Sequence, residues 1–250
     1  MIILKNDQEI LKMAEAGRIV EEALYLMEEN IRPGISTWEL DRLAEEFITK
    51  QGAVPSFKGY GGFPGSICAS VNDVVIHGFP SKKEILKEGD IISIDMGAMK
   101  DRYHGDAART FGVGEISEEA RKLIQVTKDS FFKGFAECLA GNRLSDISHA
   151  IEAYIQPFGY GVVRDYVGHG IGRSLHEAPN VPNYGKAGRG PVLREGMVLA
   201  IEPMVNAGGH EVKLLEDKWT VKTKDGSLSA HYETTVAFTK NGPQLLTLTL

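Results

Sequence analysis

An internal repeat constrains the fold of this sequence more than any other feature. Glu88–Asp95 (EGDIISID) aligns with Glu195–Glu202 (EGMVLAIE), at an offset of 202 − 95 = 107 residues. In both segments an apolar, strand-forming run ends in an acidic residue. Asp is disfavoured in strands, and a buried carboxylate without a partner costs several kcal/mol or takes up a proton. The repeat therefore predicts that something in the folded protein neutralises these acids.

Two further segment pairs extend the repeat. The helix that starts at Ile35-Ser36 aligns with the one at Leu144-Ser145, an offset of 145 − 36 = 109. His104-Gly105-Asp106 aligns with His231-Tyr232-Glu233, an offset of 233 − 106 = 127, and the extra 20 residues (127 − 107) fit a longer hairpin connection. The sequence thus predicts an α+β fold made of a duplicated unit, roughly 1–115 and 116–250, in which helices cover a curved antiparallel sheet about a pseudo-twofold axis. Since no linker divides the halves, we expect residues 1–250 to form a single domain.

Four helices are expected from periodicity and capping signals. An apolar stripe predicts a helix over 7–31, and a Ser-Thr-Trp-Glu capping box at 36–39 begins the second helix, which ends near Gly52. Glu118-Glu119 begins the third, with Cys138 and Leu139 on its apolar side and Gly141 at its end. The fourth is predicted over about 145–156.

The β-rich segments lie between and after these helices. A glycine-rich loop is expected at 59–66, followed by strands at 66–71 and 74–77. The segment 88–110 is predicted to be a hairpin that carries both Asp95 and Asp106. Further β segments follow the fourth helix.

A twofold duplication places equivalent side chains around one axis, so the repeat predicts four carboxylates in one cavity. They are Asp95, Asp106, Glu202 and Glu233. Left alone, four buried carboxylates repel one another and take up protons, whereas two divalent cations a few Å apart would neutralise them. One imidazole is available in Val167–Gly172 (VGHGIG), where glycines on both sides of His169 let the backbone approach closely. Such a mixed oxygen and nitrogen site favours Mn, Fe(II), Co or Zn over Mg or Ca.

Ordinary structural roles compete with this hypothesis. A single strand-end Asp is most often a turn or cap residue, and His169 alone fits a hydrogen-bonded loop histidine. His104 and His231 are interpreted as structural neighbours of the acids, and His149 and His210 as surface or packing residues. The coincidence of two acids in each of two aligned segments favours a shared metal site.

Composition excludes several classes of protein. The net charge is −6 with scattered Lys and Arg, which does not predict a nucleic-acid surface. Cys68 and Cys138 do not form a disulfide framework. The N-terminus does not match a secretory signal, and no run approaches the roughly 18 apolar residues of a membrane span. We expect a soluble, cytoplasmic protein.

Several motifs together resemble one family over essentially the full length. They are VNDVVIHGFP (71–80), the Asp95 to Asp106 hairpin, YVGHGIGRSLHEAP (166–179), AIEPM (200–204) and HYETT (231–235). In this combination the sequence closely resembles the type I methionine aminopeptidases, which are metallopeptidases of the pita-bread fold. The resemblance implies a dinuclear metal site, and its five ligands correspond to Asp95, Asp106, His169, Glu202 and Glu233. Asp106 and Glu233 would bridge, Asp95 would complete one site, and His169 with Glu202 the other.

The resemblance also implies a substrate and roles for other residues. The enzyme would remove the initiator methionine from nascent chains with a small second residue, through attack of a metal-activated hydroxide. His77 would lie near the scissile bond, His176 would stabilise the tetrahedral intermediate, and Glu202 would shuttle the proton. The methionine pocket corresponds to Tyr60, Phe63, Cys68, Leu175 and Trp219, with Phe57 at its rim. Leu175 and Phe63 stand where relatives often carry Phe and Tyr, which leaves the fine shape of the pocket open.

Alternatives remain within the same fold. Xaa-Pro aminopeptidases and prolidases usually carry an extra N-terminal domain, whereas only about 90 residues precede the Asp95 hairpin here. The spacings 202 − 169 = 33 and 233 − 202 = 31 leave no room for the helical insertion of type II methionine aminopeptidases. A non-catalytic binding protein or a metal-free enzyme of the creatinase kind typically lacks ligands that this sequence retains. A monovalent cation near Asn72 and Ser229, a monomeric state and action near the ribosome exit are further expectations.

Overall fold

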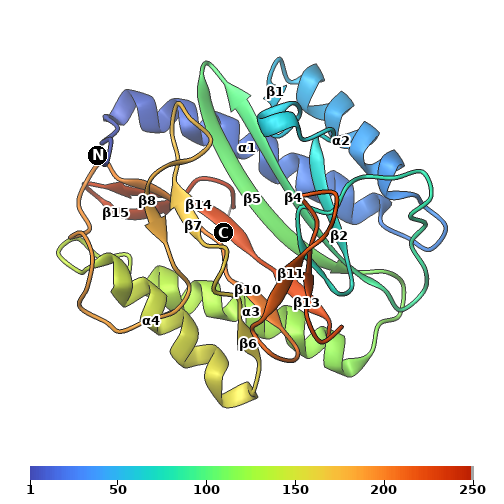
Figure 1. Cartoon of the computed structure of the whole chain (residues 1–250). Helices are drawn as coiled ribbons and strands as arrows, with labels where there is room; N and C mark the ends of the chain where they lie inside the picture. The colour runs from blue at the N-terminus through green and yellow to red at the C-terminus, as the bar shows by residue number, and fades with distance from the viewer. Residues whose placement is uncertain (249–250) are drawn as a thin grey trace.

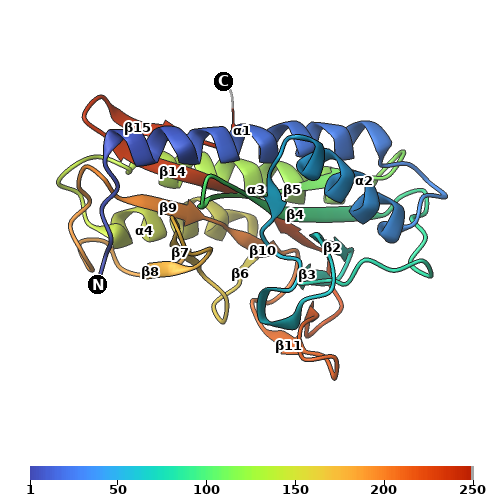
Figure 2. The same cartoon turned by 90° about the horizontal axis from the view of Figure 1, so that it is seen from above.

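The computed structural model describes residues 1–248. Four α-helices and a large curved sheet dominate it, with α1 and α2 over one half of the sheet and α3 and α4 over the other (Figure 1). The helices are α1 (Asp7–Asn30), α2 (Thr37–Lys50), α3 (Glu118–Ala136) and α4 (Leu144–Ile155). Figure 2 shows α1 along one side of the sheet and the β3 and β11 segments on the opposite side.

The sheet has nine strands and every recorded pairing is antiparallel. Its path runs β1-β4-β5-β14-β9-β7-β8, with β2 paired to β4 and β15 to β14. These strands are β1 (Val54–Pro55), β2 (Ile67–Val71), β4 (Ile91–Lys100), β5 (Tyr103–Gly112), β7 (Gly168–Gly170), β8 (Glu177–Val181), β9 (Val198–Ile201), β14 (Glu233–Thr239) and β15 (Gly242–Leu245). The α+β prediction with a helix-covered antiparallel sheet is confirmed.

Two small three-stranded sheets complete the fold. One has the order β13-β10-β6 and the other β11-β12-β3. Their strands are β3 (Val74–Ile76), β6 (Gly161–Val162), β10 (Met204–Asn206), β11 (Val212–Leu214), β12 (Val221–Thr223) and β13 (Ser229–His231). None of the helices in residues 1–248 combines the length and apolar character that a bilayer crossing requires.

Each half of the sheet packs on its own helix pair. One cluster of buried residues joins α1 and α2 to β2, β4 and β5, and another joins α3 and α4 to β9 and β14. The predicted stripe of α1 is buried at Ile10, Met13, Val20, Leu24 and Met27. The predicted capping box also forms, since the Ser36 hydroxyl accepts a hydrogen bond from the Glu39 amide and the Glu39 carboxylate accepts one from the Ser36 amide.

The repeat is present in the backbone hydrogen bonds, at a more regular offset than the sequence indicates. The N-caps of α2 and α4 are Ser36 and Arg143, an offset of 143 − 36 = 107. The isolated bridges Ser36–Ile85 and Arg143–Val192 have the same spacing, 192 − 85 = 107. The offset of 109 for these helices is therefore wrong, because it aligned two similar serines that occupy different positions in the first turn.

The alignment of the second acids also shifts by two residues. Ile94 pairs with Arg109 in the first half and Ile201 with Thr234 in the second, which gives offsets of 201 − 94 = 107 and 234 − 109 = 125. Position 106 thus corresponds to 106 + 125 = 231, and position 233 to 233 − 125 = 108. The predicted offset of 127 is therefore wrong, because it is two residues too large. A shift of two residues still keeps a side chain on the same face of a strand, so Asp106 and Glu233 can enter one cavity.

The predicted end of the third helix is also wrong. Helix α3 stops at Ala136, and Cys138 and Leu139 lie beyond it; Cys138 is fully buried, whereas Leu139 is 52% exposed. Gly141 instead has φ +97° and donates a hydrogen bond to the Leu193 carbonyl, in the turn before α4. That positive φ explains the glycine, and the chain must leave α3 earlier to reach this turn.

Candidate active site

Four neighbouring strand segments place the four acids together. Asp95 lies on β4, Asp106 on β5, Glu233 at the start of β14 and Glu202 directly after β9. Because β4, β5, β14 and β9 are consecutive in the sheet, the four carboxylates converge at its centre. All four side chains line one cavity of about 150 Å³.

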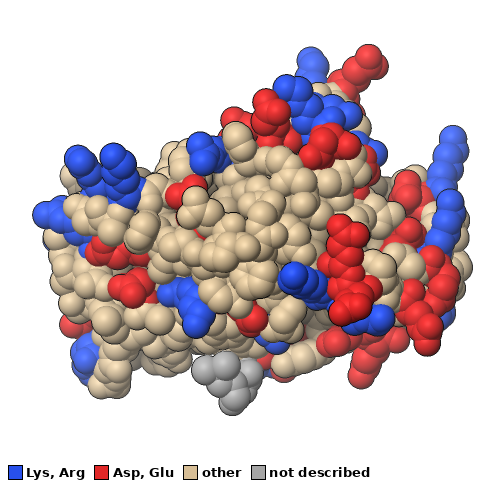
Figure 3. Space-filling model, turned by 90° about the horizontal axis from the view of Figure 1, so that it is seen from below, with Lys and Arg blue, Asp and Glu red and all other residues tan. Residues whose placement is uncertain are grey.

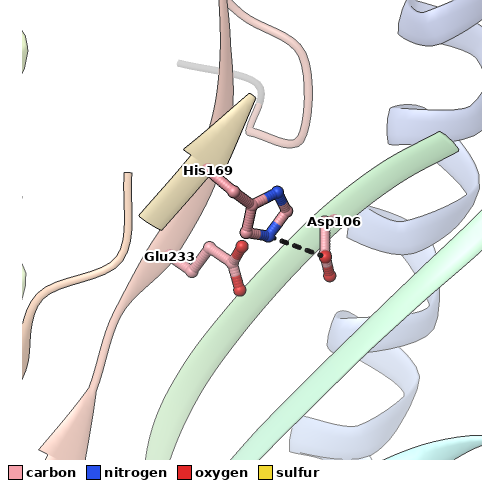
Figure 4. Close-up of side chains that lie close together, drawn as sticks. All are labelled: Asp106, His169 and Glu233. Carbon is pink, nitrogen blue, oxygen red and sulfur yellow. Dashed lines mark ion pairs between the residues drawn. The ribbon is translucent and has the colours of Figure 1, made fainter. Parts of the chain in front are cut away.

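His169 joins the carboxylates from strand β7. In Figure 4 its ring faces Asp106 and Glu233, and single ligand atoms of these three residues lie within 4.8 Å of one another. The His169 Nε2 atom is 3.8 Å from Asp106 Oδ2 and 3.6 Å from Glu202 Oε1. The Nδ1 atom is 2.9 Å from the Gly170 carbonyl oxygen, so Nδ1 carries the proton and Nε2 presents its lone pair to the acids.

The glycines beside His169 allow this close packing. A Cβ atom on Gly168 would lie 2.3 Å from the Ala200 carbonyl oxygen, and one on Gly170 would lie 2.3 Å from the Ala178 carbonyl oxygen. Burial lowers the pKa of His169 to about 4. The imidazole is therefore neutral near pH 7, the state that a metal ligand requires.

Aromatic, aliphatic and thiol side chains form the other wall of the cavity. Every residue that the sequence suggested for the substrate pocket lines it, namely Phe57, Tyr60, Phe63, Cys68, Leu175 and Trp219. Phe63 packs against Trp219 with ring centroids 5.2 Å apart. The carboxylates thus lie beside a small apolar space of the kind that accepts an unbranched side chain.

His77 and His176 also line the cavity. His77 follows β3 with φ +60°, a strained conformation for a non-glycine residue, and burial lowers its pKa to about 4. The Nδ1 atom of His176 is 2.7 Å from the Tyr60 hydroxyl, and its ring centroid is 4.2 Å from that of His169. The two imidazoles therefore flank the carboxylate cluster on the side of the apolar pocket.

Comparison with known proteins identifies the family. Residues 11–240 match Metallopeptidase family M24. The chain belongs to this family. It is 64% identical to a methionine aminopeptidase of Clostridium acetobutylicum over 248 residues, which cover 99% of both chains. It is 56% identical to methionine aminopeptidase 1 of Bacillus subtilis over 247 residues, again covering 99% of each.

Solved structures agree with this assignment to family M24. The crystal structure of methionine aminopeptidase from Thermotoga maritima matches with a TM-score of 0.98 and 46% identity, covering 100% of both chains. The prolidase from Pyrococcus furiosus matches with a TM-score of 0.77 and 26% identity, covering 99% of this chain but only 66% of the prolidase. The predicted pita-bread fold is therefore confirmed.

The acids of this M24 chain have the properties expected of a cation site. Asp95 Oδ1, Asp106 Oδ1 and Glu233 Oε1 are buried and find no hydrogen-bond partner within residues 1–248. Burial raises the pKa of Asp95 to about 7, although a hydrogen bond with Glu233 opposes the shift. Burial and the neighbouring carboxylates raise the pKa of Asp106, Glu202 and Glu233 well above the ordinary range. Unpartnered carboxylate oxygens and a neutral imidazole fit divalent metal ions.

The metal-free M24 protein is expected to lose stability as the pH rises from about 6.5 to 8.5. Its folded carboxyls have raised pKa values and bind more protons there than unfolded Asp and Glu, whose pKa values of about 4 leave them ionised. Below about 6.5 the buried histidines offset this effect, because unfolded imidazoles gain protons that the folded ones do not. Thermal unfolding with EDTA should show the melting temperature fall by roughly 5 °C over this range. Saturating Mn(II) should remove the fall, and a rise would contradict the expectation.

The structure places one further histidine, His231, beside the acids, although it does not line the cavity. His231 is buried, its Nε2 lies 3.7 Å from Glu202 Oε2, and neither ring nitrogen has a hydrogen-bond partner in the described part of the chain. It occupies the position equivalent to Asp106, which the offset of 125 would have shown. His104 instead hydrogen-bonds Ser56 and does not line the cavity, and His149 and His210 are exposed, as expected.

Proposed function

We propose that this chain is a methionine aminopeptidase, which releases an N-terminal methionine by hydrolysis of the first peptide bond. The juxtaposition of four carboxylates and an imidazole with an apolar pocket in one cavity of about 150 Å³ carries the proposal. Relatives with this name at 56–64% identity support it. The substrates would be nascent chains with a small second residue. The enzyme would be a monomer and would act in the cytoplasm, near the ribosome exit.

The proposed ligands are the five residues expected from the sequence. Asp106 and Glu233 would each contact two divalent ions, Asp95 would contact one of them, and His169 and Glu202 the other. When bound, such ions lower the pKa of a water molecule and polarise a carbonyl group. Mn, Fe(II), Co and Zn all suit this donor set, and the ion used in the cell depends on supply.

The remaining chemistry would come from side chains of the cavity. Glu202 would accept the proton of the attacking water and deliver it to the leaving amine. His176 would donate a hydrogen bond to the carbonyl oxygen as negative charge develops there, and His77 would bind near the leaving nitrogen. The apolar wall would hold the methionine thioether.

The Tyr60 hydroxyl should contribute to this chemistry through His176. Since a phenol is a good donor, the 2.7 Å contact with Nδ1 leaves the imidazole proton on Nε2, where it can reach the substrate. Tyr60→Phe should therefore lower kcat roughly fivefold, the equivalent of one neutral hydrogen bond, with little change in KM. Tyr184→Phe, which removes a hydroxyl near the Arg164 carbonyl, is the control. Unchanged kcat in Tyr60→Phe would remove this role.

The proposal is tested by methionine release from Met-Gly-X, with Met-Leu-X and Ala-Pro-X as comparison peptides. Chelated enzyme is supplied in turn with Mn, anaerobic Fe(II), Co and Zn. Metal-dependent cleavage of Met-Gly-X alone is expected. Cleavage of Ala-Pro-X instead would favour the prolidase alternative, and metal binding without any release would favour a non-catalytic binding protein.

The monovalent cation expected from the sequence also remains a proposal. A monovalent cation would lie near Asn72 and Ser229, where the Ser229 amide donates to the Asn72 carbonyl. The net charge of −6 argues against a nucleic-acid partner. On the face drawn in Figure 3, Lys and Arg also lie next to Asp and Glu rather than in one continuous patch.

A further inference from the structure

The loop 171–176, between β7 and β8, carries two residues of the cavity, Leu175 and His176. Its backbone is held by few bonds. The Ile171 amide donates to the Val198 carbonyl, the Gly172 carbonyl accepts from the His104 amide, and the Gly172 amide donates to the Ser174 carbonyl. Among these backbone bonds in residues 1–248, the Ser174 carbonyl is the only group from Arg173 to His176 that takes part, so side chains supply most of the remaining support.

The N-terminal segment supplies that support through a buried ion pair. Lys5 Nζ lies 2.6 Å from Glu177 Oε2, and the two side chains are only 4% and 5% exposed. Lys5 is itself held, since its amide donates to the Gly196 carbonyl at 2.7 Å and its ammonium donates to the Ile3 carbonyl at 3.0 Å. Glu177 directly follows His176, so the pair anchors the chain next to the imidazole.

The same pair fills the space under the loop 171–176. A Cβ atom on Gly172 would lie 2.4 Å from Lys5 Cε and 2.6 Å from Glu177 Oε1. Glu177 Oε1 also accepts a hydrogen bond from the Ser174 amide at 3.3 Å. The Glu177 carboxylate therefore joins the N-terminal segment and the loop backbone at a single point.

A second group of contacts, nearer the solvent, also holds the loop 171–176. The Tyr103 hydroxyl donates to Glu9 Oε1 at 2.6 Å and accepts from Arg173 Nε at 2.9 Å. The Arg173 side chain is 61% exposed, so its contact with Tyr103 stabilises the loop less than the buried pair does. Breaking a buried pair leaves an uncompensated charge, which makes Lys5 the more important of the two anchors.

We propose that Lys5 and Glu177 are positioning residues, which hold the loop 171–176 so that His176 and Leu175 face the substrate. This inference rests on the proposed aminopeptidase function. It makes the N-terminal segment part of the support of the active site, although Lys5 touches neither substrate nor metal ligand.

Lys5→Met, which keeps the length of the side chain and removes its charge, tests the proposal in the full chain. Lys240→Met is the matched control, because it breaks the exposed Lys240–Asp7 pair (3.4 Å) at the start of α1. For Lys5→Met, kcat on Met-Gly-X is expected to fall at least tenfold, with unchanged Mn(II) affinity by calorimetry. Amide hydrogen exchange should accelerate in 171–177 and not in α3. Lys240→Met should resemble the wild type in every measurement.

Three outcomes decide the question. A lower melting temperature with kcat within twofold of the wild type and unchanged exchange in 171–177 would overturn the positioning role and leave a purely structural one. If Lys5→Met does not fold, Lys5→Met with Glu177→Gln removes both charges, and the same loss of kcat and faster exchange are expected. If the wild type releases no methionine, the proposed function fails, while the exchange measurement still tests the positioning of the loop.

Discussion

Asp106→Asn is expected to lower methionine release from Met-Gly-X by about 10³-fold or more, since loss of the ligand proposed to be shared by two ions would remove several kcal/mol of stabilisation. The side chain keeps its size, and Asp106 has one buried oxygen without a partner in residues 1–248. An amide has one oxygen and no negative charge, so it cannot replace a carboxylate that is proposed to contact two cations. Turnover and Mn(II) affinity should fall together.

The fold of Asp106→Asn should remain intact. Removal of one carboxyl relieves repulsion in the cluster, since the Asp106 charge raises the pKa of both Glu202 and Glu233. The melting temperature of the chelated variant at pH 8 should therefore be no lower than that of the chelated wild type. Asp101→Asn in the exposed turn of the same hairpin is the control, because Asn also tolerates its φ of +49°. Near-normal turnover of Asp106→Asn with metal present would refute the assignment of Asp106.

Glu202→Gln should lower kcat by about 10² to 10⁴-fold with little change in KM, the range expected for loss of a general acid and base. The amide retains the shape of the side chain between His169 and His231 but can neither accept nor return a proton. Glu195→Gln, in the exposed lead to the same strand, is the control.

Calorimetry separates the two roles proposed for Glu202. Retained Mn(II) binding with lost turnover would favour proton transfer, and loss of one ion would show that its part as a ligand dominates. A pH–rate profile of the variant should lack the acid limb of the wild type. Turnover within tenfold of the wild type at full metal occupancy would exclude Glu202 as the proton shuttle.

Much of the architecture could be predicted because its signals are local. The stripe of α1 and the Ser36 capping box depend on residues three or four apart, and both are present in the structure. The end of α3 could not be predicted in this way. From the local sequence, Gly141 fits the end of α3 as well as it fits the turn before α4. Only its hydrogen bond with Leu193, which follows α4 along the chain, assigns it to that turn.

The candidate site could be predicted as a set of residues but not as a register. The sequence alignment of the two His-x-acid segments made Asp106 equivalent to Glu233. The strand pairing instead makes Asp106 equivalent to His231. The four acids still meet, since side chains two residues apart share one face of a strand. The same shift places His231 beside Glu202, a contact that the sequence comparison concealed.

By itself, the sequence determined that acids end or interrupt apolar strands in two related halves, and hence that one face of a central sheet would concentrate carboxylates. That conclusion needs only the period of a strand and the chemistry of Asp, Glu and His. Only the tertiary structure decided which strands are neighbours, where the register falls and that Lys5 reaches Glu177, 172 residues along the chain. These contacts depend on how the two halves and the N-terminal segment pack, which no local pattern of side chains encodes.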